Sequence, residues 1–577
     1  MTIAAMKIRS FWSHTSLLSY PHVVGIIGCF YLALIIFELV PKTMFIRSMP
    51  QDLFFQLDVI YRLLSGDKIY VDFSTPLGIA LYTIPLQFAH YTGNLALSIN
   101  YASGFLLLVF FPMVAYLAWT RLPPLLGLAL GVWIGLALAA RMNFGDDPTA
   151  VTFAMNYNRQ GAAALALAAL IYRAPLTSGP MIALADGLIY AILTGFLIYT
   201  KITFGLVSLV FAPFVIWPHR YRLVTFVAFA VVLGLLVAAV EFGYGARLQW
   251  VHAIETAIAS SRLSSGTFAH RFINLLMENL PELLVCTLIP AWFLWKDRRL
   301  TLSAIMFFVM IGGASVALVV ENGQRYYLFL PAILFFVAAP AQPGGLTMPP
   351  EAPSRQRRAG GFATITIAVL ALGSGPMLVN ILYAAYQPLV LRSAMAQQGV
   401  LGRIVIRSEA YEHELDLSAI RDGRASALDA FATGRYFKPV HPFDTLTMAE
   451  FGDYIRDGMR AAREGCSPNS RILTLDVGNP FPMLLSWPAG GPMIIIHPDR
   501  TLSKDVRPTD EEMFRNVTCV LVPKMPVKLE ARDFMIEVYS NYLADKFVAS
   551  YDTPLWKVLA LKPALPRSAP PTTAGRQ

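Results

Sequence analysis

Charge and histidine are scarce in this chain of 577 residues, and their scarcity excludes several classes of protein. Only 14% of the residues are charged and 56% are hydrophobic, which is too apolar for a soluble protein of this length. No GxGxxG run marks a nucleotide-binding fold. The net charge of +9 lies in short clusters between apolar runs, unlike a nucleic-acid-binding surface. The histidines are scattered, so we expect no cofactor, and a divalent metal is allowed but unsupported.

Cysteine is almost absent, and the four that occur show no metal-binding or disulfide spacing. Cys29 and Cys286 fall within apolar runs, where a thiol usually serves as a small core residue. Cys466 and Cys519 lie in the polar C-terminal part and would be able to pair if that part is exported. The sequence alone leaves this pairing open.

The hydrophobic residues gather in runs that are long enough to cross a membrane. Lys7 and Arg9 precede the first run, Val23–Val40, but the run is long and no small-residue cleavage site follows. This favours a retained span over a signal peptide. The pattern predicts a polytopic α-helical membrane protein with about eleven transmembrane helices. Their approximate ranges are 22–41, 95–119, 124–140, 160–172, 180–200, 203–217, 223–243, 283–295, 300–320, 327–340 and 361–385.

Basic residues recur at every second connection between these runs. Placing them all in the cytoplasm satisfies the positive-inside rule. It puts the N-terminus inside and the C-terminal domain on the periplasmic side of a bacterial inner membrane. The segment 76–91 is apolar enough to span, but counting it would invert every later cluster, so we expect a helix at the outer face. The clusters are Lys7/Arg9, Arg121, Arg173, Arg220/Arg222, Lys296/Arg298/Arg299 and Arg355/Arg357/Arg358.

Composition divides the chain into two domains and a tail. Residues 1–386 form the expected transmembrane domain, whose outer loops are 42–94, 141–159 and 244–282. Residues 387–562 alternate helical and short β-rich patterns, which predicts an exported α/β domain, and the tail 563–577 is expected to be disordered. The predicted helices there are Met448–Glu464 and Glu530–Lys546, and the predicted strands are Arg471–Asp476, Met493–His497, Val517–Val522 and Trp556–Leu561. The run Asp476–Phe481 is either a simple turn or part of a sugar or acceptor groove.

The first outer loop holds four aspartates, at positions 52, 58, 67 and 72. Carboxylates beside a bilayer are costly unless they meet water, a partner or a substrate, so this loop is a candidate site. Asp52 is either catalytic or an N-cap that follows Pro50. Asp58 is either a site residue or the partner of Arg62 in an i,i+4 ion pair, which would lower its pKa. A helix over 52–65 would place its polar side in water and bury an apolar stripe of Leu53, Leu57, Ile60, Tyr61 and Leu64.

The order of residues in this loop is an acidic residue, a glycine fourteen positions later, Tyr-x-Asp-Phe and then Pro-x-Gly. Here these are Asp52, Gly66, Tyr70-Val71-Asp72-Phe73 and Pro76-Leu77-Gly78. The order resembles the first outer loop of GT-C membrane glycosyltransferases, in particular bacterial enzymes similar to protein O-mannosyltransferases and lipid A aminoarabinose transferases. The resemblance gives Asp52 the family's role of the base that deprotonates the acceptor. Many relatives have an Asp-Glu pair there; here Leu53 follows, so Asp52 acts alone or with Asp58 or Asp72.

Two further segments resemble the same family. Gly195–Lys201 is similar to a helix that ends in Thr-Lys, whose lysine faces the phosphate of the lipid-linked donor. Without an anion, Lys201 would have to snorkel. Arg325 and Tyr326 resemble the Arg-Tyr motif that opens a late span, where Arg325 would either bind phosphate or pair with Glu321.

The second outer loop resembles the family only over a short stretch. Asp147 precedes Pro148 where many relatives carry an aspartate, and Arg159 lies on the same side of the membrane. These two residues are either supporting site residues or a turn and a helix-end charge.

The resemblance implies a glycosyltransferase that moves a sugar from a polyprenyl phosphate to a hydroxyl of a cell-envelope glycan, lipid or protein. Asp52 would take the hydroxyl proton, and Lys201 and Arg325 would stabilise the departing phosphate. Direct attack would invert the anomeric carbon. One alternative is a transporter or flippase of lipid-linked sugars, although the chain shows no internal repeat. Another is a membrane-anchored structural or sensor protein that works through its C-terminal domain.

Overall fold

The computed structural model divides the chain into two compact units. The first comprises Met1–Glu409 with Asp499–Thr501, and the second comprises Ala410–Pro498 with Leu502–Gln577. The structure describes residues 19–41, 44–143, 146–173, 175–217, 220–243, 301–322, 353–390, 404–406, 446, 448–498 and 501–563, and scattered positions between 251 and 296.

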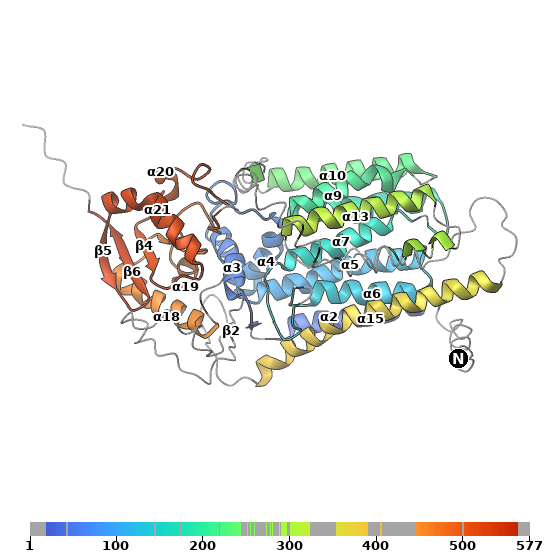
Figure 1. Cartoon of the computed structure of the whole chain (residues 1–577), viewed down its shortest axis with the longest axis horizontal. Coiled ribbons are helices and arrows are strands. Elements are labelled where there is room, and N and C mark those ends of the chain that lie inside the picture. The colour runs from blue at the N-terminus through green and yellow to red at the C-terminus, as the bar shows by residue number, and fades with distance from the viewer. Residues whose placement is uncertain are drawn as a thin grey trace, which may run out of the picture. The chain divides into compact units, whose positions relative to one another are not determined.

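Long helices that lie side by side make up the first unit (Figure 1). Most begin or end at a proline or a short polar turn, as expected where an apolar run stops. They are α2 (Tyr20–Leu39), α5 (Ser98–Arg121), α6 (Pro124–Ala139), α7 (Asn156–Leu170), α8 (Pro180–Thr200), α9 (Ile202–Ile216), α10 (Arg222–Gly243), α13 (Leu302–Asn322) and α15 (Pro353–Val390).

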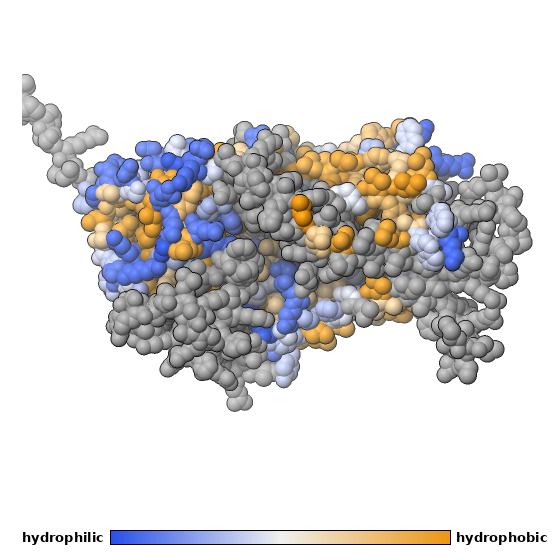
Figure 2. Space-filling model, in the orientation of Figure 1, coloured by the Kyte–Doolittle hydropathy of each residue, from blue (hydrophilic) through white to orange (hydrophobic). Residues whose placement is uncertain are grey.

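Five helices in the described residues are long and apolar enough to cross a membrane: α2, α5, α8, α10 and the part of α15 from Thr366 to Gln387. Large apolar side chains such as Leu223 and Leu235 on α10 are exposed, and Figure 2 shows apolar surface in the region of α10. Such a surface requires lipid, so this unit is that of a polytopic membrane protein. Two predicted spans, 283–295 and 327–340, fall largely or wholly outside the described residues, and the count of eleven stays a prediction.

Helix α7 forms the centre of the bundle. All its residues except Tyr157 are buried, and six of them are alanines between Ala162 and Ala169. Small side chains let neighbouring helices approach closely, and α7 packs against α5, α6, α8 and α9. The polar N-terminus of α7, from Asn156 to Gln160, is thereby fixed against its neighbours.

Two short helices and a strand pair lie at one end of the bundle (Figure 1). Helix α3 (Pro50–Leu64) is followed by α4 (Ala80–Thr92), which packs on α3, α5 and α8. With 13 residues, α4 is too short to span a bilayer. Strand β1 (Met44–Ile46) pairs in parallel with β2 (Ile404–Ile406), so the segment that precedes α3 is tied to the segment that follows α15.

The second unit has a four-stranded sheet of order β3-β4-β6-β5. The predicted strand Met493–His497 was wrong: this segment is irregular, and the Ile496 N–H donates to the Val477 carbonyl at 3.0 Å. The edge strand β5 was missed because all its residues except Phe547 are exposed and show no alternation. The strands are β3 (Ile472–Thr474), β4 (Cys519–Pro523), β5 (Phe547–Asp552) and β6 (Trp556–Leu561), and the longer helices are α18 (Met448–Gly465) and α21 (Leu529–Lys546).

Two features hold this unit together. A disulfide joins Cys466, just after α18, to Cys519 in β4, which answers the pairing that the sequence left open. The buried carboxylate of Asp476 accepts hydrogen bonds from the backbone N–H groups of Val477, Val527 and Lys528. Residues 476–481 are all buried. They therefore form a buried structural turn.

Candidate functional site

Helix α3 starts one turn earlier than an Asp52 N-cap would allow. Met49, in the left-handed conformation at φ 50°, is the N-cap, and Pro50 fills the first helical position. Asp52 lies in the first turn, where the helix dipole favours a carboxylate, and its side chain is half-buried. The N-cap interpretation of Asp52 was therefore wrong, while its position at the start of α3 keeps the carboxylate near the surface of the unit.

The expected polar face of α3 does not lie in water. Asp58 and Arg62 form the predicted i,i+4 ion pair at 3.2 Å, but each side chain is only 2% exposed. The ring of Phe73 covers the Arg62 guanidinium at 5.4 Å. The apolar stripe is also narrower than expected, because Leu64 is exposed and Tyr61 half-buried. Phe73, in the loop after the helix, therefore folds back over this face, which helical periodicity cannot reveal.

Burial decides the titration of Asp58. Loss of water raises the pKa of Asp58 from its usual 3.8 to about 6, and the attraction of Arg62 only partly offsets this. Arg62 lowers this pKa as expected, but burial outweighs it, so the expected net decrease in the pKa of Asp58 was wrong. A raised pKa suits a base, but a carboxylate that is 2% exposed and bonded to Arg62 cannot reach an acceptor hydroxyl.

The loop after α3 is held by its own side chains. Asp72 is exposed and accepts a hydrogen bond from the Lys68 N–H at 2.8 Å, which closes a tight turn. Tyr70 adopts a left-handed backbone at φ 64°, and its hydroxyl donates to the Leu77 carbonyl at 2.7 Å. The Tyr-x-Asp-Phe segment thus works as a folded unit that presents Gly78.

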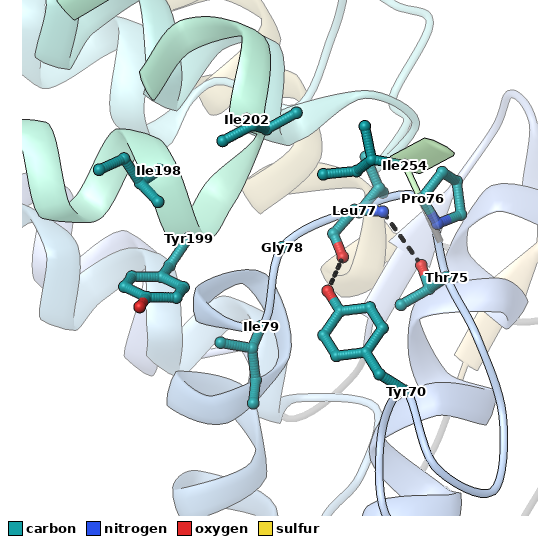
Figure 3. A pocket seen from close by; sticks show the side chains of 10 residues that line it. All are labelled: Tyr70, Thr75, Pro76, Leu77, Gly78, Ile79, Ile198, Tyr199, Ile202 and Ile254. Atoms are coloured by element: carbon teal, nitrogen blue, oxygen red, sulfur yellow. Dashed lines mark hydrogen bonds between the residues drawn. The ribbon is translucent and has the colours of Figure 1, made fainter. Parts of the chain in front are cut away.

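Gly78 brings this loop into direct contact with the end of α8 (Figure 3). Its N–H donates to the Thr200 carbonyl at 3.0 Å. A Cβ at Gly78 would lie 2.1 Å from the Tyr199 carbonyl oxygen, so any larger residue would push the loop away. The cavity at this contact has a volume of only ≈ 10 Å³, room for about one water.

Lys201 occupies the junction between α8 and α9. Its extended backbone (φ −159°, ψ 122°) ends one helix and begins the next. The side chain is half-buried, and its ammonium lies 5.4 Å from the centre of the Tyr157 ring. An aromatic face stabilises a cation without neutralising its charge. The contact of Gly78 with Thr200 therefore brings the acid-rich loop next to a cation.

The second outer loop contributes less than expected. Asp147 is exposed and accepts hydrogen bonds from the N–H and the hydroxyl of Thr149, a turn arrangement. Arg159 is buried at the start of α7 and donates to the Met142 carbonyl. The loop is joined to α3 by Gln56, whose amide donates to the Phe153 carbonyl at 2.9 Å. These contacts favour structural roles for Asp147 and Arg159.

Sequence reasoning missed a buried ion pair near this loop. Glu38, at the end of α2, binds Arg141 at 2.7 Å, and both side chains are less than a tenth exposed. The side-chain oxygen of Asn380 on α15 accepts from the Arg141 N–H at 2.6 Å. Glu38 was the sequence feature that could have revealed this pair, since a carboxylate within an apolar run needs a partner.

The contacts above do not bear on Arg325, on Tyr326 or on a metal site. Arg325 and Tyr326 lie outside the described residues. Within the residues that the structure describes, no group of three or more His, Cys, Asp or Glu side chains is arranged to hold a metal ion. The arrangement that is described combines a half-buried carboxylate, an acid-rich loop and a cation beside an apolar bundle. Chemically, a carboxylate is able to accept a proton and a cation is able to attract an anion.

No family model and no curated protein matches the sequence. The chain is similar to two crystal structures of ArnT from Cupriavidus metallidurans, one in the apo state and one bound to undecaprenyl phosphate. The identities are 13% and 12%, the TM-score is 0.37 in both, and 93% of this chain and 97% of the ArnT chain are covered. At this TM-score the likeness assigns neither a fold nor an activity to this chain.

Proposed function

We propose that this protein is a membrane glycosyltransferase that moves a sugar from a polyprenyl phosphate to a hydroxyl acceptor. The observation that carries the proposal is the contact of Gly78 with the α8–α9 junction, where a Cβ would lie 2.1 Å from the Tyr199 carbonyl. That contact holds the loop that follows Asp52 and carries Asp72 against Thr200, the residue before Lys201. A base and a phosphate-binding cation are the two groups that such a transfer requires.

The chemistry needs little else from the protein. Asp52 removes the proton from the acceptor hydroxyl as its oxygen attacks the anomeric carbon, and the bond from that carbon to the phosphate oxygen breaks. Lys201 and Arg325 take up the negative charge that develops on the departing phosphate. Because phosphate is a good leaving group, no general acid is required. A single displacement of this kind inverts the anomeric carbon.

The remaining residues have supporting roles in this proposal. Asp58 and Arg62 hold α3 against Phe73, and Asp72 closes the turn that shapes the loop. Asp147 and Arg159 fix the second loop, and Tyr326 is assigned a supporting role. No metal is assigned a role.

We further propose that the loop and the C-terminal unit face the periplasm. The Cys466–Cys519 disulfide supports this side, because such bonds persist in oxidising compartments and are rare in the cytosol. Cysteines introduced at Ser65, which is exposed, and at Ser408 should react with an impermeant reagent in intact spheroplasts. Labelling of both positions only after lysis would mean that the loop and the C-terminal unit face the cytoplasm.

The direct test is transfer. The purified protein is incubated with radiolabelled polyprenyl-phosphate sugars and membrane extracts, and the label is followed from lipid to product. We expect loss of label from one donor and gain by a larger molecule. Movement of labelled lipid across vesicle membranes without any transfer would favour the alternative of a transporter or flippase. Neither transfer nor movement would favour a structural or sensor protein.

A further inference from the structure

A second cavity lies between α3, α4, α5, α7 and α8, and part of its lining is polar. Its volume is ≈ 20 Å³, enough for about one water or one hydroxyl group. The polar side chains that line it are all uncharged, namely Gln56, Ser103, Asn156, Gln160 and Thr200. An uncharged polar lining inside an apolar bundle is costly unless something completes its hydrogen bonds.

Thr200 shows that this completion is missing within the protein. Its side chain is 1% exposed, and its hydroxyl has no hydrogen-bond partner. The amides opposite are held in place, since Gln56 donates to the Phe153 carbonyl at 2.9 Å and Asn156 donates to Gln56 at 3.4 Å. The cavity is therefore a fixed set of amides that faces an unsatisfied hydroxyl.

The position of the cavity relates it to the proposed reaction. Gln56 follows Asp52 by one turn of α3, on the same face of the helix. Thr200 directly precedes Lys201, and its carbonyl is the group that Gly78 binds. The cavity is thus lined by a residue one helical turn from the candidate base and by the residue next to the candidate phosphate-binding cation. In a transfer from a sugar phosphate, the sugar occupies the space between these two groups.

We propose that this cavity receives one hydroxyl group of the transferred sugar, bound by Thr200 and the amides of Gln56, Asn156 and Gln160, and that this sugar is uncharged at that position. This inference rests on the proposed function. An ammonium group in the same place would be buried without a carboxylate among the described lining residues, and a buried unpaired charge is far more costly than a buried hydroxyl.

The test compares three lipids on the full-length protein in detergent: undecaprenyl phosphate that carries a neutral hexose, the same lipid with an amino sugar, and sugar-free undecaprenyl phosphate. Wild-type protein should bind the neutral donor more tightly than the amino-sugar donor. Thr200→Val and Gln160→Leu should each weaken binding of the neutral donor by roughly 3- to 10-fold, the effect of losing one neutral hydrogen bond. Binding of the sugar-free lipid should stay within about twofold, because these residues would not touch phosphate.

Thr203→Val is the matched control. The Thr203 hydroxyl is also buried without a partner, one turn further along the chain in α9, but Thr203 does not line the cavity. This variant should bind all three lipids as wild type does. Gln160→Glu should in turn strengthen binding of the amino-sugar donor relative to binding of the neutral donor.

Two outcomes would overturn the subsite while leaving the proposed function intact. One is equal weakening of sugar-bearing and sugar-free lipids by Thr200→Val, which would mean that the lining acts on phosphate or on the fold. The other is unchanged donor binding in Thr200→Val and Gln160→Leu alike. A wild-type protein that binds none of the three lipids would instead remove the proposed function, and the subsite with it.

Discussion

The two ends of α8 hold their cations in opposite ways. Near its start, Arg121 binds Asp186 at 2.6 Å with both side chains fully buried, and the Arg121 Nε–H also donates to the Arg173 carbonyl. At its far end, Lys201 is half-buried and lies over the ring of Tyr157. An ion pair satisfies charge and hydrogen bonds at once, whereas an aromatic ring leaves the positive charge in place. The first arrangement is a buried ion pair of the fold, and the second leaves the Lys201 side chain partly accessible to solvent.

The same contrast separates two aspartates on α3. Asp58 is buried against Arg62, and Asp52 is half-buried in the first turn. We therefore expect the more exposed carboxylate, Asp52, to take part in the chemistry and the buried one, Asp58, to serve the fold. The following predictions test this distinction for the two aspartates of α3 and for the cations at the two ends of α8.

The largest effect is expected at Asp52. Asp52→Asn removes a basic carboxylate but keeps its shape, and should reduce the transfer rate roughly 10²- to 10⁴-fold. The unfolding temperature and donor binding should stay near wild type. Turnover under saturating donor is the measurement. If Asp52→Asn turned over normally and a folded Asp58→Asn variant were inactive, the base would be Asp58.

The buried pair should matter for stability instead. Arg121→Ala leaves Asp186 as an uncompensated buried charge, which typically costs about 3–5 kcal/mol. We expect a large fall in thermal stability in detergent, with normal donor affinity in whatever fraction folds. The double variant Arg121→Met with Asp186→Leu should recover most of the stability. A stable Arg121→Ala protein with impaired donor binding would show that this end is functional.

Substitutions of Lys201 should affect the kinetics with the lipid-linked donor. Lys201→Ala loses one charge-assisted contact, about 1.5–3 kcal/mol, and should raise the donor KM, lower kcat, or both, by about 10- to 150-fold. Lys201→Arg should be only partly tolerated, because a planar fork does not replace a point charge in a tight junction. Arg325→Ala should behave like Lys201→Ala. Wild-type donor kinetics in both Ala variants would place the donor phosphate elsewhere.

The smallest effect is a pH dependence at Asp58. Burial raises its pKa from 3.8 to about 6 in the folded protein, so folding favours the protonated form. Its contribution to stability is full below the unfolded pKa of about 4 and is lost as the pH rises through about 6. The unfolding temperature of wild type, relative to Asp58→Asn, should therefore rise from pH 7 to pH 5. A fall over the same range would mean that attraction by Arg62 outweighs burial.

Sequence patterns predicted what is local. Long apolar runs located the helices that the structure describes, and the i,i+4 spacing of Asp58 and Arg62 predicted their ion pair. The predictions that failed depended on contacts between segments that are distant in the sequence. The polar face of α3 was expected in water because nothing in its periodicity shows that Phe73 folds back over it. The sign of the pKa shift at Asp58 was wrong for the same reason, since burial depends on distant segments.

The candidate site shows the same division. The residue types at Asp52 and Lys201 were visible in the sequence, but the contact that brings their segments together runs through the backbone of Gly78 and Thr200. Backbone contacts leave no side-chain pattern except the glycine itself. The amides of Gln56 and Asn156 were likewise passed over, because an uncharged polar residue near a helix end is ordinary until its partner is known.

The pairing of β1 with β2 sets an order of assembly. Met44 and Ile404 are neighbours in the sheet although several hundred residues separate them. At a synthesis rate of about 5–20 residues per second, β2 emerges roughly 20–70 s after β1. Throughout that interval every intervening helix is made while the entry to α3 still lacks its partner strand. The segment that leads into α3 therefore gains this anchor last, and a nascent chain that stops before β2 would reach the membrane with its helices in place and this anchor missing.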